Sequence, residues 1–229
     1  MDYPIPITSR LFKGMTREEA SQLLSGLGAE VKHYPRGAYV VHEGDPKVHF
    51  GVVLDGELTM YETDADGRRS LVGCLRPPNC VALTFAFAGL DRHPATVKAK
   101  VDSTLLRIPV ARVQAMLGSS CDAIQRRFLG NLTAEICELA WDHRFRTYLL
   151  SRRSTRERVL TYLRRKMRDA GSHSFTIPVD RNGMADYLCV DRSALSVVLS
   201  RLKDEGIITY VKNRFTVTKP SEGDVYSAK

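Results

Sequence analysis

The sequence predicts an α+β protein with three parts in order: a β-roll, a long helix, and a small helical module closed by a β-hairpin. Three observations support this fold class. Short β-branched and aromatic runs separated by turn residues fill positions 31–108. Apolar residues at helical spacing follow over positions 120–150. Two short amphipathic helices and two short strands are then indicated between positions 180 and 217.

The first part, expected as a domain over 1–118, opens with a short helix over 16–28. Thr16 and Glu19 form a capping-box pattern at its start, and Gly28 marks its end. Beyond it, turn signals such as Asp55-Gly56 and Asp66-Gly67 interrupt the apolar runs at close intervals. Close turns between short strands are typical of an all-β roll or sandwich.

The second part, expected over 119–150, is a single helix with a 3,4,3,4 apolar spacing. Such a stripe is typical of a coiled-coil seam and needs a partner surface. The partner is either the preceding roll or a second copy of the chain, and the length and heptad spacing favour a dimer. The predicted dimer interface consists of Leu129, Leu132, Ile136, Leu139 and His143.

The third part, expected over 151–229, follows a polar break at 151–154. A helix over 155–169 and a short strand near Phe175 precede the segment 180–205, which predicts two helices joined by three or four residues. Asp191 is a fitting N-cap for the second helix. A hairpin with Lys212-Asn213 as its turn comes next. This order of elements predicts a winged helix-turn-helix.

The charge of the chain is concentrated in that third part. The net charge is +8; residues 1–143 hold 16 Lys and Arg against 17 Asp and Glu, whereas residues 144–229 hold 18 against 9. A basic module joined to a neutral one indicates a polyanionic partner, because each neutralised phosphate releases counterions. The sequence therefore predicts binding to double-stranded DNA.

The second helix of the predicted motif offers residues suited to reading bases, because its first turns reach the major groove in this docking mode. Arg192 suits guanine and Val197 suits a thymine methyl group. The predicted base-reading positions are Arg192, Ser193, Ser196, Val197 and Ser200. The predicted DNA contacts further include Asn182 and, as phosphate contacts, Arg181, Arg201, Lys203, Lys212 and Arg214.

From about position 11 to 218 the chain resembles the cyclic-AMP receptor protein/FNR (Crp/Fnr) family of transcription regulators. The segments that carry the resemblance are Tyr34-Pro35-Arg36-Gly37, Val53-Leu54-Asp55-Gly56-Glu57-Leu58, His93-Pro94-Ala95-Thr96 and Val190-Asp191-Arg192-Ser193. The resemblance implies a homodimer with a cyclic-nucleotide-binding-like jelly roll, palindromic operators with half-sites one helical turn apart, and RNA polymerase as a partner if the protein activates transcription.

The departures from the family concern its effector. Val81-Ala82-Leu83 replaces the stretch whose Glu binds ribose in members that bind cyclic AMP, and His93-Pro94 replaces their phosphate-binding Arg-Ser/Thr pair, with Arg92 one place early. A buried phosphate without a charged partner is costly. We therefore expect a small effector other than cyclic AMP to bind here. The alternative is that the apolar residues of this region only form the core of the roll. The predicted effector-binding residues are Val81, Leu83, Phe85, Arg92 and His93.

Two further departures concern DNA. Ser193 and Val197 stand where the cyclic-AMP-dependent members carry Glu and Arg, so the operator should differ. Cys189 stands where the turn usually has Gly.

FNR-type oxygen sensing is excluded because residues 1–30 contain no cysteine.

Other functional classes receive less support. The longest uncharged run, 77–90, is too short to span a bilayer, and the N-terminus lacks signal-peptide features, so we expect a cytoplasmic protein. Five scattered cysteines form no CxxC pair, and no metal site is expected. We expect no enzymatic activity, because the histidines are too widely spaced for a cupin-like metalloenzyme. An effector-binding regulator that does not bind DNA is the remaining alternative.

Overall fold

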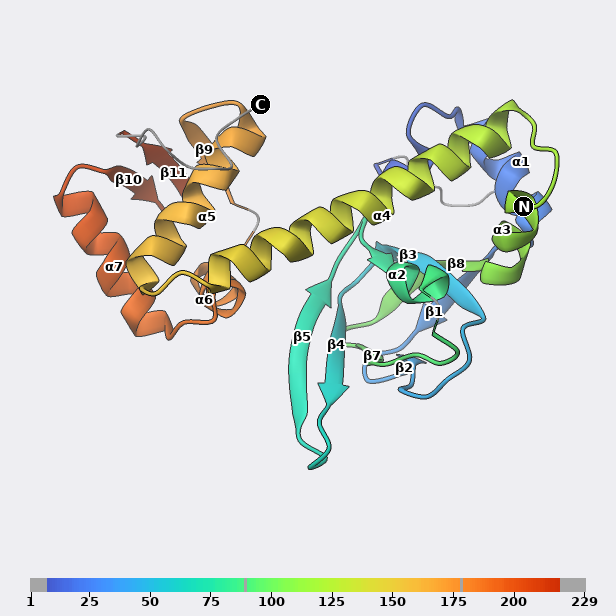
Figure 1. Ribbon diagram of the computed structural model, residues 1–229, viewed down its shortest axis with the longest axis horizontal. Coiled ribbons are helices and arrows are strands. Elements are labelled where there is room, and N and C mark those ends of the chain that lie inside the picture. The colour runs from blue at the N-terminus through green and yellow to red at the C-terminus, as the bar shows by residue number, and fades with distance from the viewer. Residues whose placement is uncertain (1–7, 89, 178, 219–229) are drawn as a thin grey trace. The chain divides into compact units, whose positions relative to one another are not determined.

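The computed structural model describes residues 8–88, 90–177 and 179–218, and the chain divides into two compact units, Met1–Ala140 and Trp141–Lys229. The division falls inside the long helix α4 (Ala123–Leu150), ahead of the 151–154 break. It does so because Phe145 and Leu149 are buried in the core of the C-terminal unit. Figure 1 shows the elements of each unit.

The N-terminal unit is an antiparallel β-roll flanked by helices. Its helical segments are Arg10–Phe12 (η1, a 3-10 turn), α1 (Arg17–Leu27), α2 (Leu83–Phe87), α3 (Val110–Leu117) and the first part of α4. Its strands are β1 (Glu30–Tyr34), β2 (Tyr39–Val41), β3 (His49–Asp55), β4 (Leu58–Thr63), β5 (Arg69–Leu75), β6 (Cys80–Val81), β7 (Thr96–Ala99) and β8 (Ser103–Pro109). They form two four-stranded sheets, ordered β1-β8-β3-β6 and β2-β7-β4-β5.

Alternation along the strands divides the apolar side chains of this unit between two cores. Val53 and Leu105 belong to the cluster inside the roll, whereas Val52 and Leu106 belong to the cluster under the helices. This division follows from the two-residue period of a strand, which turns neighbouring side chains to opposite faces. The sheet β1-β8-β3-β6 is therefore covered on both faces.

The sequence signals at the start of the chain are confirmed. The Thr16 side chain accepts a hydrogen bond from the amide of Glu19 (3.1 Å), and the Glu19 carboxylate accepts one from the amide of Thr16 (2.9 Å). Gly28 ends α1 in a left-handed conformation, with φ of 66°. These contacts are local, so their residue spacing alone was sufficient to predict them.

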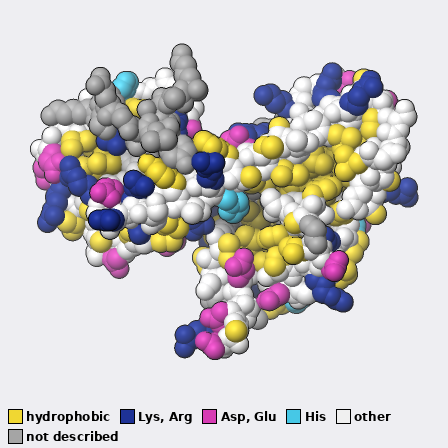
Figure 2. Space-filling model, in the orientation of Figure 1, with side chains coloured by type: hydrophobic (Ala, Val, Ile, Leu, Met, Phe, Trp, Pro, Cys, Tyr) yellow, Lys and Arg dark blue, Asp and Glu magenta, His cyan; other side chains and the backbone are white. Residues whose placement is uncertain are grey.

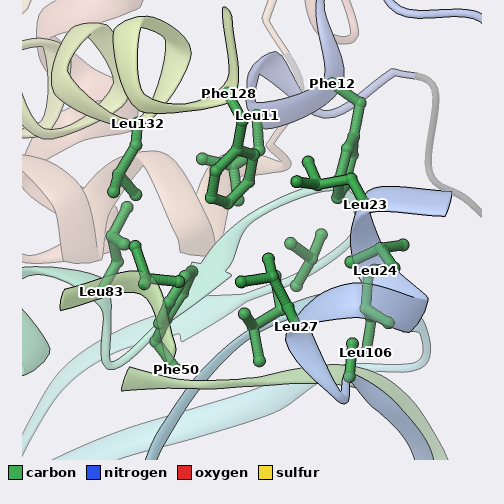
Figure 3. Close-up of a cluster of buried hydrophobic side chains, with 14 of the residues drawn as sticks. Leu11, Phe12, Leu23, Leu24, Leu27, Phe50, Leu83, Leu106, Phe128 and Leu132 are labelled. Carbon is green, nitrogen blue, oxygen red and sulfur yellow. The ribbon is translucent and has the colours of Figure 1, made fainter. Parts of the chain in front are cut away.

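The apolar stripe of α4 packs partly on its own roll. Leu132 is 4% exposed and, like Phe128, belongs to the helix-side core; Figure 3 shows both side chains pointing from α4 into this cluster. Leu129, Ile136 and Leu139 are half-buried against the same cluster. Leu132 therefore leaves almost no surface for a second chain, and the dimer role of its neighbours stays a prediction.

The C-terminal unit combines helices with a three-stranded antiparallel sheet. Its elements are α5 (Thr155–Ala170), β9 (Ser174–Thr176), α6 (Arg181–Leu188), α7 (Arg192–Asp204), β10 (Ile208–Val211) and β11 (Arg214–Val217). The sheet order is β10-β11-β9. A single core joins the end of α4 to α5, α6, α7 and the sheet. Within the residues described, no helix is both long enough and apolar enough to cross a bilayer.

Candidate DNA interface

The corner between α6 and α7 is built by local capping. Asp180 accepts a hydrogen bond from the amide of Gly183 (2.8 Å) at the start of α6, and Asp191 accepts one from the amide of Ser193 (2.7 Å) at the start of α7. Cys189 ends α6 in a left-handed conformation, with φ of 49°. That conformation costs a residue other than glycine about 1–2 kcal/mol. The predicted helix-turn-helix is present, with a cysteine in its strained turn.

The buried faces of the two helices agree with the sequence prediction. Met184, Ala185 and Leu188 of α6 are at most 2% exposed. Leu195, Leu199 and Leu202 of α7 are fully buried, and Val198 is half-buried. Because this face of α7 is committed to the core, its other face is available for a ligand.

The exposed face of α7 carries the side chains predicted to read bases. They are Arg192, Ser193, Ser196, Val197 and Ser200, all of them exposed. The Ser193 hydroxyl donates to the Asp191 carboxylate, and the Ser196 hydroxyl donates to the carbonyl of Arg192 (2.9 Å). Both hydroxyls therefore keep lone pairs that can accept a hydrogen bond from an amino group on a base edge.

The wing is a tight hairpin between β10 and β11. Val211 pairs with Arg214 across the turn, and Lys212 has a left-handed backbone with φ of 51°. Besides the base-reading set, five of the predicted DNA contacts are exposed: Asn182, Arg201, Lys203, Lys212 and Arg214. The charges of the four cations and the amide of Asn182 are suited to phosphate oxygens, and such contacts position a protein on DNA without specifying sequence.

Arg181 differs from this set because its side chain is half-buried. Its guanidinium carbon lies 4.9 Å from the ring centroids of both Tyr210 and Phe215. Its Nη2 atom donates to the carbonyl of Lys212 (2.8 Å). Burial lowers the pKa of Arg181.

Two other arginines bind groups within the C-terminal unit in a way that the sequence did not indicate. Arg156 on α5 makes a bidentate contact with Glu205, the residue that caps α7, with N–O distances of 2.8 and 2.5 Å. Arg158, also on α5, donates to four backbone carbonyls. The partners of Arg156 and Arg158 lie up to 49 residues away, and no local pattern marks such pairs.

Comparisons with known proteins agree with this geometry. Residues 31–120 match the family model of the cyclic nucleotide-binding domain, and residues 157–222 match that of the Crp-like helix-turn-helix domain. The two matches correspond to the β-roll and to the segment that holds α6, α7 and the wing. The chain belongs to the Crp/Fnr family of transcription regulators.

Individual Crp/Fnr proteins resemble the chain over most of its length. The nitrogen fixation regulation protein FixK of Bradyrhizobium diazoefficiens is 25% identical over 207 residues, covering 88% of this chain and 83% of FixK. The transcriptional activator protein FnrL of Cereibacter sphaeroides is 28% identical over 195 residues, covering 81% of this chain and 75% of FnrL.

Solved structures share the fold at low identity. FixK2 from Bradyrhizobium japonicum matches with a TM-score of 0.55 and 22% identity, over 83% of this chain and 93% of FixK2. The c-di-GMP responsive regulator CLP of Xanthomonas campestris matches with a TM-score of 0.59 and 16% identity, over 90% of this chain and all of CLP. The predicted fold class is therefore confirmed.

Two of the residues predicted to bind an effector belong to different hydrophobic clusters. Val81 lies in the cluster inside the roll and Leu83 in the helix-side cluster, and both are 2% exposed. Between them Ala82 has a left-handed conformation, with φ of 59°. These contacts favour the interpretation that Val81 and Leu83 fill the two cores.

The remaining predicted effector residues are also engaged within the N-terminal unit. The Phe85 ring lies edge-on to the ring of buried His93, with centroids 6.2 Å apart. The Arg92 guanidinium donates to the carbonyl of Gly44 (2.8 Å). Burial lowers the pKa of His93, which favours its neutral form. Across the residues that the structure describes, no group of three His, Cys, Asp or Glu side chains could hold a metal ion.

Proposed function

We propose that this Crp/Fnr protein binds duplex DNA sequence-specifically as a cytoplasmic homodimer, with α7 of each subunit in a major groove. The observation that carries the proposal is the division of α7 into two faces. Leu195, Leu199 and Leu202 anchor one face in the core, and the opposite face exposes Arg192 and Val197. Arg192 is suited to guanine O6 and N7, and Val197 to a thymine methyl group.

The dimer seam in this proposal is the exposed part of the apolar stripe on α4. Leu129, Ile136 and Leu139 are half-buried, and His143 is exposed. Figure 2 shows apolar side chains gathered on the face of the N-terminal unit that α4 crosses. A two-fold dimer through α4 would present two copies of α7 to a palindromic operator.

The signal in this proposal is a small effector other than cyclic AMP. Arg92, one place before the family's phosphate-binding position, donates to the Gly44 carbonyl, and the position of the ribose-binding Glu is aliphatic. A cyclic phosphate would lack the charge-assisted hydrogen bonds that offset its desolvation. We expect millimolar cyclic AMP to leave the thermal midpoint of the full-length protein unchanged.

The experiment that tests the proposal begins by selecting duplexes from a random pool with the full-length protein. The dissociation constant for the selected duplex is then measured at several salt concentrations. Arg192→Ala should weaken binding by about 10- to 100-fold and relax the preference at one base position. Arg126→Ala removes the same charge from the exposed surface at the start of α4 and serves as the matched control.

Two outcomes would contradict the proposal. The first is an affinity that does not change with salt, because contacts with phosphates release counterions. The second is an Arg192→Ala variant that binds as tightly as Arg126→Ala. The second result alone would exclude Arg192 as a base-reading residue, and both together would favour an effector-binding regulator that does not act through DNA.

A further inference from the structure

Arg181 is the first residue of α6, yet its side chain contacts the wing. The guanidinium carbon lies 4.9 Å from the ring of Tyr210 on β10 and 4.9 Å from the ring of Phe215 on β11. The two rings have centroids 5.5 Å apart and belong to neighbouring strands. One planar cation therefore packs on both strands of the hairpin, as arginine does on aromatic faces.

A hydrogen bond extends this contact to the turn of the wing. Arg181 Nη2 donates to the carbonyl of Lys212 at 2.8 Å. Lys212 is the left-handed residue of the turn, and Asn213 beside it donates through its side chain to the carbonyl of Ile177 (3.1 Å). The turn is thus held from two directions, and the orientation of the Lys212 side chain depends on it.

The hairpin turn that Arg181 contacts carries two predicted phosphate contacts. Lys212 and Arg214 are both exposed, and they follow one another closely at the turn and the start of β11. Arg181 itself is half-buried, with its guanidinium committed to two rings and a carbonyl. Its geometry thus suits support of the wing better than a contact with DNA.

We propose that Arg181 is a positioning residue, which orients the basic turn of the wing toward the DNA backbone and does not bind phosphate itself. This inference rests on the proposed DNA-binding function. It assigns the contacts with phosphate to Lys212 and Arg214, and assigns to Arg181 the coupling between α6 and the wing.

The test uses Arg181→Lys, which keeps the charge but loses the planar fork that packs on the rings and reaches the Lys212 carbonyl. A phosphate contact tolerates this change, whereas a positioning role does not. In full-length protein on the selected duplex, we expect Arg181→Lys to weaken binding by about 10-fold. The matched control is Arg126→Lys, a charge-preserving change at an exposed position of α4 outside the proposed interface, and we expect an effect below about 2-fold.

A double-mutant cycle supplies a readout that a general loss of stability would not move. Once Lys212→Ala and Arg214→Ala have removed the charges of the wing, its orientation no longer matters. Arg181→Lys should then have no further effect on the dissociation constant, because coupled sites are not additive. The slope of affinity against salt should already have fallen by about two phosphate equivalents in that background.

Three results would overturn the proposal. The first is that Arg181→Lys binds as tightly as the wild type, and the second is that Arg181→Lys weakens binding equally with and without the wing charges. The third is that Arg181→Met lowers the slope of affinity against salt by one further phosphate equivalent. A wild-type protein without any salt-dependent DNA binding would instead refute the proposed function. The two failures are therefore distinguishable.

Discussion

The guanidinium of Arg158 donates from Nη1 to the carbonyl of Cys189, the left-handed residue between α6 and α7, at 3.2 Å. The same nitrogen reaches the carbonyl of Leu188 at 3.3 Å. Nη2 reaches the carbonyl of Leu150 at the end of α4, and Nε reaches that of Arg152, both at 3.2 Å. One side chain thus binds the turn of the recognition motif to the end of the long helix.

Replacing Arg158 by Met should destabilise the C-terminal unit by about 2 kcal/mol, because half-buried carbonyls lose hydrogen bonds to a charged donor. Arg158→Lys should recover part of the loss, since an ammonium group cannot reach all four carbonyls. Urea unfolding of the full-length protein, followed by circular dichroism, measures the free energy of unfolding of both variants. Arg153→Met, at an exposed position in the segment 151–154 before α5, is the control. If this control lost as much stability as Arg158→Met, the network would have no special role.

The Cys189 position offers a prediction of opposite sign. Its φ of 49° is strained for cysteine and free for glycine, and its side chain is exposed. Cys189→Gly should therefore stabilise the C-terminal unit by about 1 kcal/mol, after the greater entropy of an unfolded glycine is subtracted. Thermal unfolding should show a midpoint several degrees higher. Cys189→Ala keeps the strain and should show no gain; a gain of equal size there would assign the effect to loss of the thiol.

The cap of α7 predicts a dependence on pH. Hydrogen bonds from the Ser193 hydroxyl, and then from the amides of Ser193 and Ala194, lower the pKa of Asp191. A carboxyl whose pKa is lower in the folded state stabilises the fold above its unfolded pKa of about 3.9, and that contribution is lost as the pH falls through the folded pKa.

We expect an NMR titration of Asp191 to show a midpoint below that of an unfolded peptide. Ser193→Ala removes the largest cause, so it should move the midpoint upward. Asp191→Asn keeps the cap acceptor without the charge, and the acid-dependent loss of helix stability below about pH 4 should diminish. An Asp191 midpoint that Ser193→Ala leaves in place would contradict the assigned cause.

The sequence was informative wherever a structural feature depends on near neighbours. The Thr16 capping box, the Asp191 cap, and the Lys212-Asn213 turn are all recognisable from residues within a few positions of each other. The contacts of Arg181 with Lys212, and of Arg158 with Leu188 and Cys189, join residues about 30 positions apart, so only tertiary packing brings them together. Sequence reasoning therefore predicted the exposed face of α7 but missed the contacts of Arg181 and Arg158.

The apolar stripe of α4 shows the same limit. Its 3,4,3,4 spacing identifies a buried face but not what buries it, since a roll and a second helix both accept leucine. The structure commits Leu132 to the roll, whereas Ile136 is only half-buried. Ile136 is thus the better position at which to test the dimer, because a change at Leu132 would damage the N-terminal core as well.

Ile136→Lys should convert the protein from dimer to monomer, since an ammonium group in an apolar seam loses its hydration. Sedimentation velocity measures the change, and circular dichroism at an unchanged intensity shows that the fold persists. Ala134→Lys adds the same charge at an exposed position two residues away, on the other side of α4. That control should remain dimeric.

DNA binding separates loss of the dimer from loss of the fold. On a palindromic duplex, Ile136→Lys should bind at least about 100-fold more weakly than the wild type, because the second half-site no longer benefits from a tethered partner. On a duplex with one half-site, the single α7 helix is intact, so the variant should bind about as well as one wild-type subunit. A dimeric Ile136→Lys protein would contradict a subunit contact through this face of α4, whereas equal loss on both duplexes would indicate damage to the fold.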